Sequence, residues 1–157
     1  MGIGLAEAFP AAKAVFDEVD DALGQKLSAL MWEGPEADLT LTENAQPALM
    51  AVSLAAMRAL ETKGFTLPGN VAFLAGHSLG EYSALAASGA LSLADTARLL
   101  KTRGQAMQAA VPVGEGAMAA LLGAVLSQAL EVAEAAAEGE CFQAAIDKGP
   151  GQVVFSG

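Results

Sequence analysis

Five consecutive residues, Gly76-His77-Ser78-Leu79-Gly80, carry the clearest chemical signal in the sequence. They match the G-x-S-x-G pattern of a nucleophile elbow, in which a serine occupies a sharp turn between a strand and a helix. Such a turn strains the serine backbone and exposes its hydroxyl, and the flanking glycines remove side chains that would collide there. The amide of Leu79 opens the following helix and is the natural hydrogen-bond donor to an oxyanion. A chain with 17 glycines can match this pattern by chance, but the apolar run before it and the helical pattern after it favour Ser78 as a nucleophile.

His77 is the only histidine in the sequence. Neighbouring residues on an elbow point in divergent directions, so its imidazole cannot reach the hydroxyl of Ser78. We therefore interpret His77 as a packed residue that braces the turn beside the substrate. On this interpretation the chain contains no imidazole base for a serine mechanism.

Three other residues are candidates for a role in the site. Arg103 lies 25 residues after Ser78, and an arginine near a nucleophile selects acyl groups that carry a carboxylate. On spacing alone, a solvated arginine late in a helix is an equal alternative. Gln46 stands at the start of a buried helix and can support a polar site, but a helix-capping amide is the favoured interpretation. Cys141 is a candidate for a second nucleophile, but the sequence offers it no acid–base partner, so we expect it to be a small core residue.

Hydrophobic spacing predicts a mixed α/β protein in which a buried strand precedes the elbow. Residues 71–75 form that strand. The composition shifts near Gly114, which predicts a second, smaller subdomain from there. The predicted helices span residues 5–23, 26–32, 47–63, 81–90, about 93–108 and 127–137. The first of them has a break at Pro10 and ends at Gly24, and Ser92 or Asp95 caps the helix that runs to about 108. The other predicted strands are 117–122, 141–145 and 152–156.

Charge and composition exclude several classes of function. The formal net charge of −10 argues against binding to the phosphate backbone of nucleic acid and against docking on anionic lipid. One cysteine and one histidine cannot build an ordinary zinc site, so we expect no metal. The longest apolar run, residues 47–57, is far short of the roughly 20 residues that span a bilayer. A single cysteine and the lack of a secretory signal predict a cytoplasmic protein.

Four segments in the same order resemble the malonyl-CoA:acyl carrier protein transacylase family of fatty-acid and polyketide synthesis: residues 44–52, 76–108, 116–123 and 149–157. The resemblance implies an α/β-hydrolase-like large subdomain, of which residues 1–113 are a part, and a ferredoxin-like small subdomain, of which residues 114–157 are a part. It implies a ping-pong transfer without a cofactor. Malonyl passes from coenzyme A to a serine and then to the phosphopantetheine thiol of acyl carrier protein.

The resemblance also implies roles for single residues. Ser78 is the nucleophile, the Leu79 amide is one oxyanion donor, Arg103 holds the malonyl carboxylate, and Gln46 is the glutamine near that arginine. The family's opening glycine-rich loop and its catalytic histidine have no counterpart in the sequence. We therefore expect an N-terminal-half fragment that lacks its general base and whose exposed strand edges favour self-association.

Two other functions stay open at this stage. A serine esterase or thioesterase uses the same elbow but gives the acyl group to water. Alternatively, the chain is a non-catalytic fragment that binds a partner, such as acyl carrier protein or a second chain that completes the enzyme.

Overall fold

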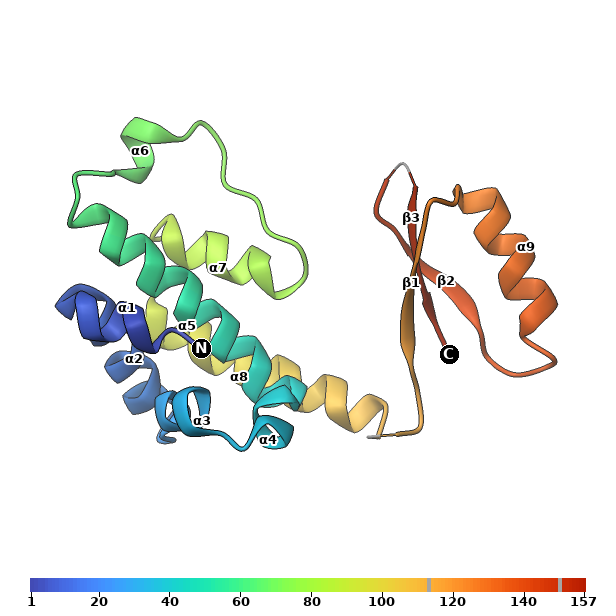
Figure 1. Ribbon diagram of the computed structural model, residues 1–157, viewed down its shortest axis with the longest axis horizontal. Helices are drawn as coiled ribbons and strands as arrows, with labels where there is room; N and C mark the ends of the chain where they lie inside the picture. Colours follow the sequence, from blue (N-terminus) through green and yellow to red (C-terminus); the bar gives the residue numbers. More distant parts are fainter. Residues whose placement is uncertain (113, 150) are drawn as a thin grey trace. The chain divides into compact units, whose positions relative to one another are not determined.

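The computed structural model describes residues 1–112, 114–149 and 151–157. The chain divides into two compact units, Met1–Ala110 and Val111–Gly157. In its described residues the first unit is helical, and the second combines a three-stranded sheet with a helix (Figure 1). The helices of the first unit are α1 (Ile3–Ala8), α2 (Pro10–Leu23), α3 (Leu27–Glu33), α4 (Glu36–Thr40), α5 (Thr42–Glu61), α6 (Leu67–Asn70), α7 (Leu79–Ala87) and α8 (Leu93–Ala110).

Local signals in the sequence set several of these boundaries. The predicted break at Pro10 is confirmed, because Pro10 is the first residue of α2, where its missing N–H costs nothing. Gly24 ends α2 with a left-handed φ of 59°. Ser92 caps α8, since its hydroxyl accepts a hydrogen bond from the Asp95 amide at 3.0 Å.

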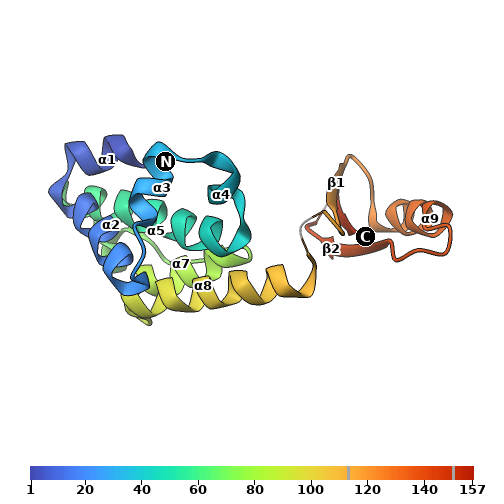
Figure 2. The ribbon, with the colours of Figure 1, turned by 90° about the horizontal axis from the view of Figure 1, so that it is seen from below.

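The helix α5 is the centre of the first unit and packs against α2, α7 and α8 (Figure 2). It begins at Thr42, five residues before the predicted start at Pro47. Pro47 lies inside the helix, where its ring removes the hydrogen bond to the carbonyl of Glu43. Gln46 therefore does not cap this helix, and the capping interpretation is wrong. The core residues of α5 are Ala48, Met50, Ala51, Leu54, Ala55 and Ala59.

The predicted strand at residues 71–75 is wrong. These residues are irregular, and the side chain of Phe73 is 92% exposed. A strand buried in a parallel sheet needs hydrogen-bonding neighbours, and the described residues of the first unit contain no strand. The apolar sequence alone therefore does not produce the strand. The expected self-association through such exposed segments stays a prediction.

A close approach between α5 and α8 fixes the position of α8 beside Arg103. A Cβ on Gly104 would lie 2.4 Å from the Cα of Glu43 and 2.7 Å from the carbonyl oxygen of Thr42, so only glycine fits there. Beside this contact, Lys101 makes an ion pair with Glu43 at 3.1 Å. The hydrogen bond from Lys101 holds the pKa of the Glu43 carboxyl below its ordinary value, although desolvation acts in the opposite direction. One turn of α8 is thus held against the first turn of α5.

The second unit contains the three short strands and the helix that the sequence predicts. They are β1 (Met118–Leu122), α9 (Leu126–Ala136), β2 (Gln143–Asp147) and β3 (Gln152–Ser156). Both β1 and β2 pair antiparallel with β3, in the order β1-β3-β2. Val153 and Phe155 pack with Ala129 and Ala133 of α9.

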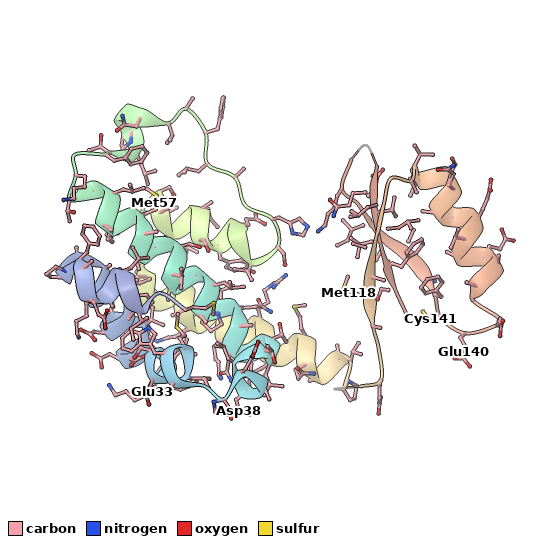
Figure 3. All side chains as sticks on the ribbon, viewed as in Figure 1. Glu33, Asp38, Met57, Met118, Glu140 and Cys141 are labelled. Carbon is pink, nitrogen blue, oxygen red and sulfur yellow. The ribbon has the colours of Figure 1, made fainter. Side chains whose placement is uncertain are left out.

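Cys141 is not a core residue. It is exposed on the segment that leads from α9 into β2 (Figure 3). Among the described helices of both units, none has the length and the apolar character that a bilayer crossing requires.

The close approach at Gly104 predicts that alanine destabilises the protein at this position but not at a glycine with open space around it. We expect Gly104→Ala to lower the free energy of unfolding by about 1–3 kcal/mol, because the new methyl group overlaps backbone atoms of α5 that cannot move aside cheaply. Gly4→Ala, at an open position in α1, is the matched control and should be neutral or stabilise by up to about 1 kcal/mol. Urea unfolding of the two variants measures the difference, and equal midpoints would contradict the close approach.

Candidate active site

The turn before α7 has the strained geometry that the elbow pattern predicts. Ser78 has φ 54° and ψ −118°, a conformation that residues with a side chain rarely adopt, and its side chain is exposed. A Cβ on Gly76 would lie 1.9 Å from the carbonyl carbon of Gly80, so the chain can turn this tightly only with glycine at 76. The turn presents the Ser78 hydroxyl at the N-terminus of a helix.

The first amides of α7 are only partly used by the protein itself. The Gly80 amide donates to the His77 carbonyl at 2.9 Å, and the Glu81 amide donates to the Ser78 carbonyl at 3.2 Å. Within the described residues, no acceptor takes a hydrogen bond from the Leu79 amide. Leu79 therefore offers a free N–H next to Ser78, at the positive end of the helix dipole.

Arg103 lies beside Ser78 rather than in bulk solvent. Its Nη2 donates a hydrogen bond to the Ser78 Oγ at 3.0 Å, and its Nη1 donates to the Oε1 of Gln46. The guanidinium carbon lies 5.9 Å from the centre of the Tyr82 ring. The half-buried guanidinium thus joins α8 to α5 and to the start of α7.

Gln46 is buried inside α5, where its side chain is only 3% exposed. Its Oε1 accepts the hydrogen bond from Arg103, while its Nε2 donates to the Thr42 Oγ1 at 2.8 Å and to the Met107 Sδ at 3.3 Å. Every polar atom of this amide therefore has a protein partner. The structure brings Gln46, Arg103, Ser78 and Leu79 together in one region.

The interpretation of His77 as a packed residue is wrong. Its side chain is exposed, because the irregular segment before it leaves the turn uncovered on that side. The imidazole makes no hydrogen bond to the described residues, and only its backbone carbonyl takes part in the turn. His77 is thus not placed as a base for Ser78.

Sequence reasoning missed four residues that shape the site. Thr42 lies four residues before Gln46 on α5, and Tyr82 lies four residues after Ser78, the residue that precedes α7, so the spacing of both pairs contained a readable signal. Met107 and Gly104 act across the contact between α5 and α8, and no local pattern indicates such a contact. Among the described residues, no cluster of three or more His, Cys, Asp or Glu side chains is arranged to hold a metal ion.

Comparison with known proteins identifies the family. The whole chain, residues 1–157, matches the family model described as acyl transferase domain. The chain belongs to this family. The malonyl CoA-acyl carrier protein transacylase of Bacillus subtilis strain 168 is 49% identical over 158 residues, which is 100% of this chain and 49% of the relative. The protein of the same name from Escherichia coli K12 is 42% identical over 153 residues, 98% of this chain and 48% of the relative.

Solved structures agree with the sequence relatives. An acyl-carrier-protein-S-malonyltransferase from Bartonella henselae has a TM-score of 0.91 and 58% identity, over 100% of this chain and 50% of that one. A malonyl-transacylase in complex with its type II polyketide acyl carrier protein has a TM-score of 0.88 and 41% identity, with the same coverage. The predicted resemblance to malonyl transacylases and the α/β acyltransferase fold are thus confirmed. The chain spans about half the length of the curated relatives it matches.

The positive φ of Ser78 predicts that glycine stabilises the protein more than alanine at this position, the reverse of the usual order. Ser78→Ala retains the Cβ and the strain, whereas Ser78→Gly removes both, so we expect the glycine variant to be more stable by about 1 kcal/mol. At Ser88, whose φ of −74° is helical, the glycine variant should be less stable than the alanine variant by about 0.5–1 kcal/mol. Urea unfolding of the four variants tests this. If glycine destabilises both sites equally, the turn at Ser78 is not strained.

Proposed function

We propose that this chain carries the nucleophile and the carboxylate-binding arginine of a malonyl transferase. That enzyme moves malonyl from coenzyme A to acyl carrier protein. One observation carries the proposal: the Arg103 guanidinium donates hydrogen bonds to the Ser78 Oγ and to the buried Gln46 at the same time. A fixed cation touching a serine nucleophile suits a substrate whose acyl group ends in a carboxylate.

In the first half-reaction the Ser78 Oγ attacks the thioester carbonyl, an ester forms, and the thiol of coenzyme A leaves. The Leu79 amide is one donor to the oxyanion of the tetrahedral intermediate. In the second half-reaction the phosphopantetheine thiol attacks the ester and restores the hydroxyl. No imidazole among the described residues faces Ser78, so we assign the role of general base to none of them.

Arg103 has donors to spare for a carboxylate. A guanidinium has five N–H groups, and within the described residues two hydrogen bonds to acceptors use it. A malonyl ester on Ser78 brings its carboxylate within reach of this cation, whereas an acetyl ester offers no such group. A hydrogen bond between charged groups at a half-buried site contributes about 2 kcal/mol, which corresponds to roughly 30-fold discrimination.

The proposal extends to the subdomains and to the partners. Residues 1–113 are proposed as part of an α/β-hydrolase-like large subdomain and residues 114–157 as part of a ferredoxin-like small subdomain. The β-α-β-β order of the second unit, with β3 between β1 and β2, supports the second assignment. The relative whose structure was solved in complex with an acyl carrier protein supports that carrier as the acceptor. A cytoplasmic location is proposed from the single cysteine.

The other two functions are not favoured. A serine esterase or thioesterase does not need a buried amide and an arginine held at the nucleophile, and the relatives described above are transferases. Binding of a partner alone does not require a strained backbone at Ser78.

The test measures loading of Ser78 in the protein at its full natural length. We expect Arg103→Ala to lower the preference for malonyl-CoA over acetyl-CoA by about 10- to 100-fold, because the acyl carboxylate loses its partner. Intact-protein mass spectrometry follows the adduct, with Ser78→Ala as the blank. Arg98→Ala, which removes an exposed arginine of the same helix, should keep the preference. An adduct on Ser78→Ala, or an unchanged preference in Arg103→Ala, would contradict the proposal.

A further inference from the structure

The contact that holds Arg103 continues beyond Gln46 to a residue on the first turn of α5. The Gln46 Nε2 donates to the Oγ1 of Thr42 at 2.8 Å. Thr42 makes no contact with Ser78 that would suggest a direct role. Its backbone carbonyl faces Gly104, next to Arg103 in sequence, at the closest approach of α5 and α8.

The chemistry of the side chains fixes which way the Gln46 amide faces. A guanidinium only donates hydrogen bonds, so the atom of Gln46 that meets Arg103 has to be the oxygen. The two N–H groups of the amide then need acceptors on the other side. The structure provides the Thr42 hydroxyl and the Met107 thioether, of which the hydroxyl is the stronger acceptor. With Gln46 only 3% exposed, water does not replace a lost acceptor easily.

We propose that Thr42 is a positioning residue for acyl selectivity. Its hydroxyl orients the Gln46 amide, and the amide oxygen orients the Arg103 guanidinium beside Ser78. This inference rests on the proposed function, because selectivity for a carboxylate matters only if Arg103 binds one. Thr42 itself touches neither substrate nor nucleophile.

Removing the hydroxyl has a defined consequence. Thr42→Val keeps the shape of the side chain but leaves the buried amide N–H groups with a thioether as their only acceptor. The amide then turns away from its present orientation to find other acceptors, and its oxygen no longer holds Nη1. Arg103 retains its contact with Ser78 and with the Tyr82 ring. Its guanidinium samples more orientations, which weakens two-point binding of a carboxylate.

The kinetic test uses the protein at its full natural length, with malonyl-CoA and acetyl-CoA as donors. We expect Thr42→Val to raise the KM for malonyl-CoA about 10-fold, with little change in kcat and none in acetyl transfer. Thr42→Ser retains the hydroxyl and should stay within about 2-fold of the wild type. Thr62→Val removes a hydroxyl at the other end of α5, where it bonds the Ala59 carbonyl, and should leave both donors unaffected. If Thr42→Val does not fold, Thr42→Ala removes the same hydroxyl.

A second measurement does not depend on the reaction. In a ¹H–¹⁵N spectrum, we expect the Nε–H resonance of Arg103 to be sharp in the wild type and in Thr42→Ser, and broadened in Thr42→Val. An unchanged Arg103 resonance in Thr42→Val overturns the inference. An equal loss of malonyl and acetyl transfer also overturns it, because that result indicates a purely structural role. If the wild type shows no malonyl loading, the proposed function fails, and the resonance alone still decides whether Thr42 orients Arg103.

Discussion

One guanidinium joins the three helices on which the site depends. Arg103 projects from α8, donates to Gln46 of α5 and to Ser78 at the start of α7, and lies near the ring of Tyr82. The donors of a guanidinium have fixed directions, so their acceptors have to lie in fixed places. The geometry of the site therefore depends on how these three helices pack. The close contact at Gly104 and the ion pair between Lys101 and Glu43 hold α8 where the guanidinium can reach both acceptors.

The second constraint is local and lies in the backbone of Ser78. A left-handed φ at a residue with a side chain costs free energy, and such strain is kept only where the surrounding structure enforces it. Glycine at 76 permits the close approach to Gly80 that the turn needs, and the helix that begins at Leu79 follows the turn directly. The result is a hydroxyl that faces outward, next to a free amide and a cation. The hydroxyl and the amide suit a serine nucleophile and an oxyanion donor, and the cation suits an acyl group that carries a carboxylate.

Local signals in the sequence predicted much of this structure, and non-local contacts account for the errors. Pro10, Gly24 and Ser92 mark helix ends through their own backbone and side-chain chemistry, so their positions were readable. Residues 71–75 have the composition of a buried strand, but a strand depends on hydrogen-bonding neighbours that the described residues of the first unit do not supply. The side chain of His77 is exposed for a related reason, because the irregular segment 71–75 before it leaves the turn uncovered. The elbow around Ser78 was predicted from its own pattern, and a place for Arg103 in the site was implied by the family resemblance. Thr42 contacts Gln46 one turn away on α5, a spacing that the sequence contained but that was not used. Met107 acts through a contact that only the packing of α5 against α8 creates.

In the proposed function, Arg103 binds the acyl carboxylate while that acyl group is attached to Ser78. A crystal structure of the protein at its full natural length, trapped with malonyl as an ester on Ser78, tests it most directly. We expect both carboxylate oxygens within hydrogen-bond distance of the Arg103 guanidinium, with Nη1 still held by the Gln46 oxygen. A malonyl carboxylate that faces solvent, or that is bound by another residue while Arg103 points elsewhere, would contradict it.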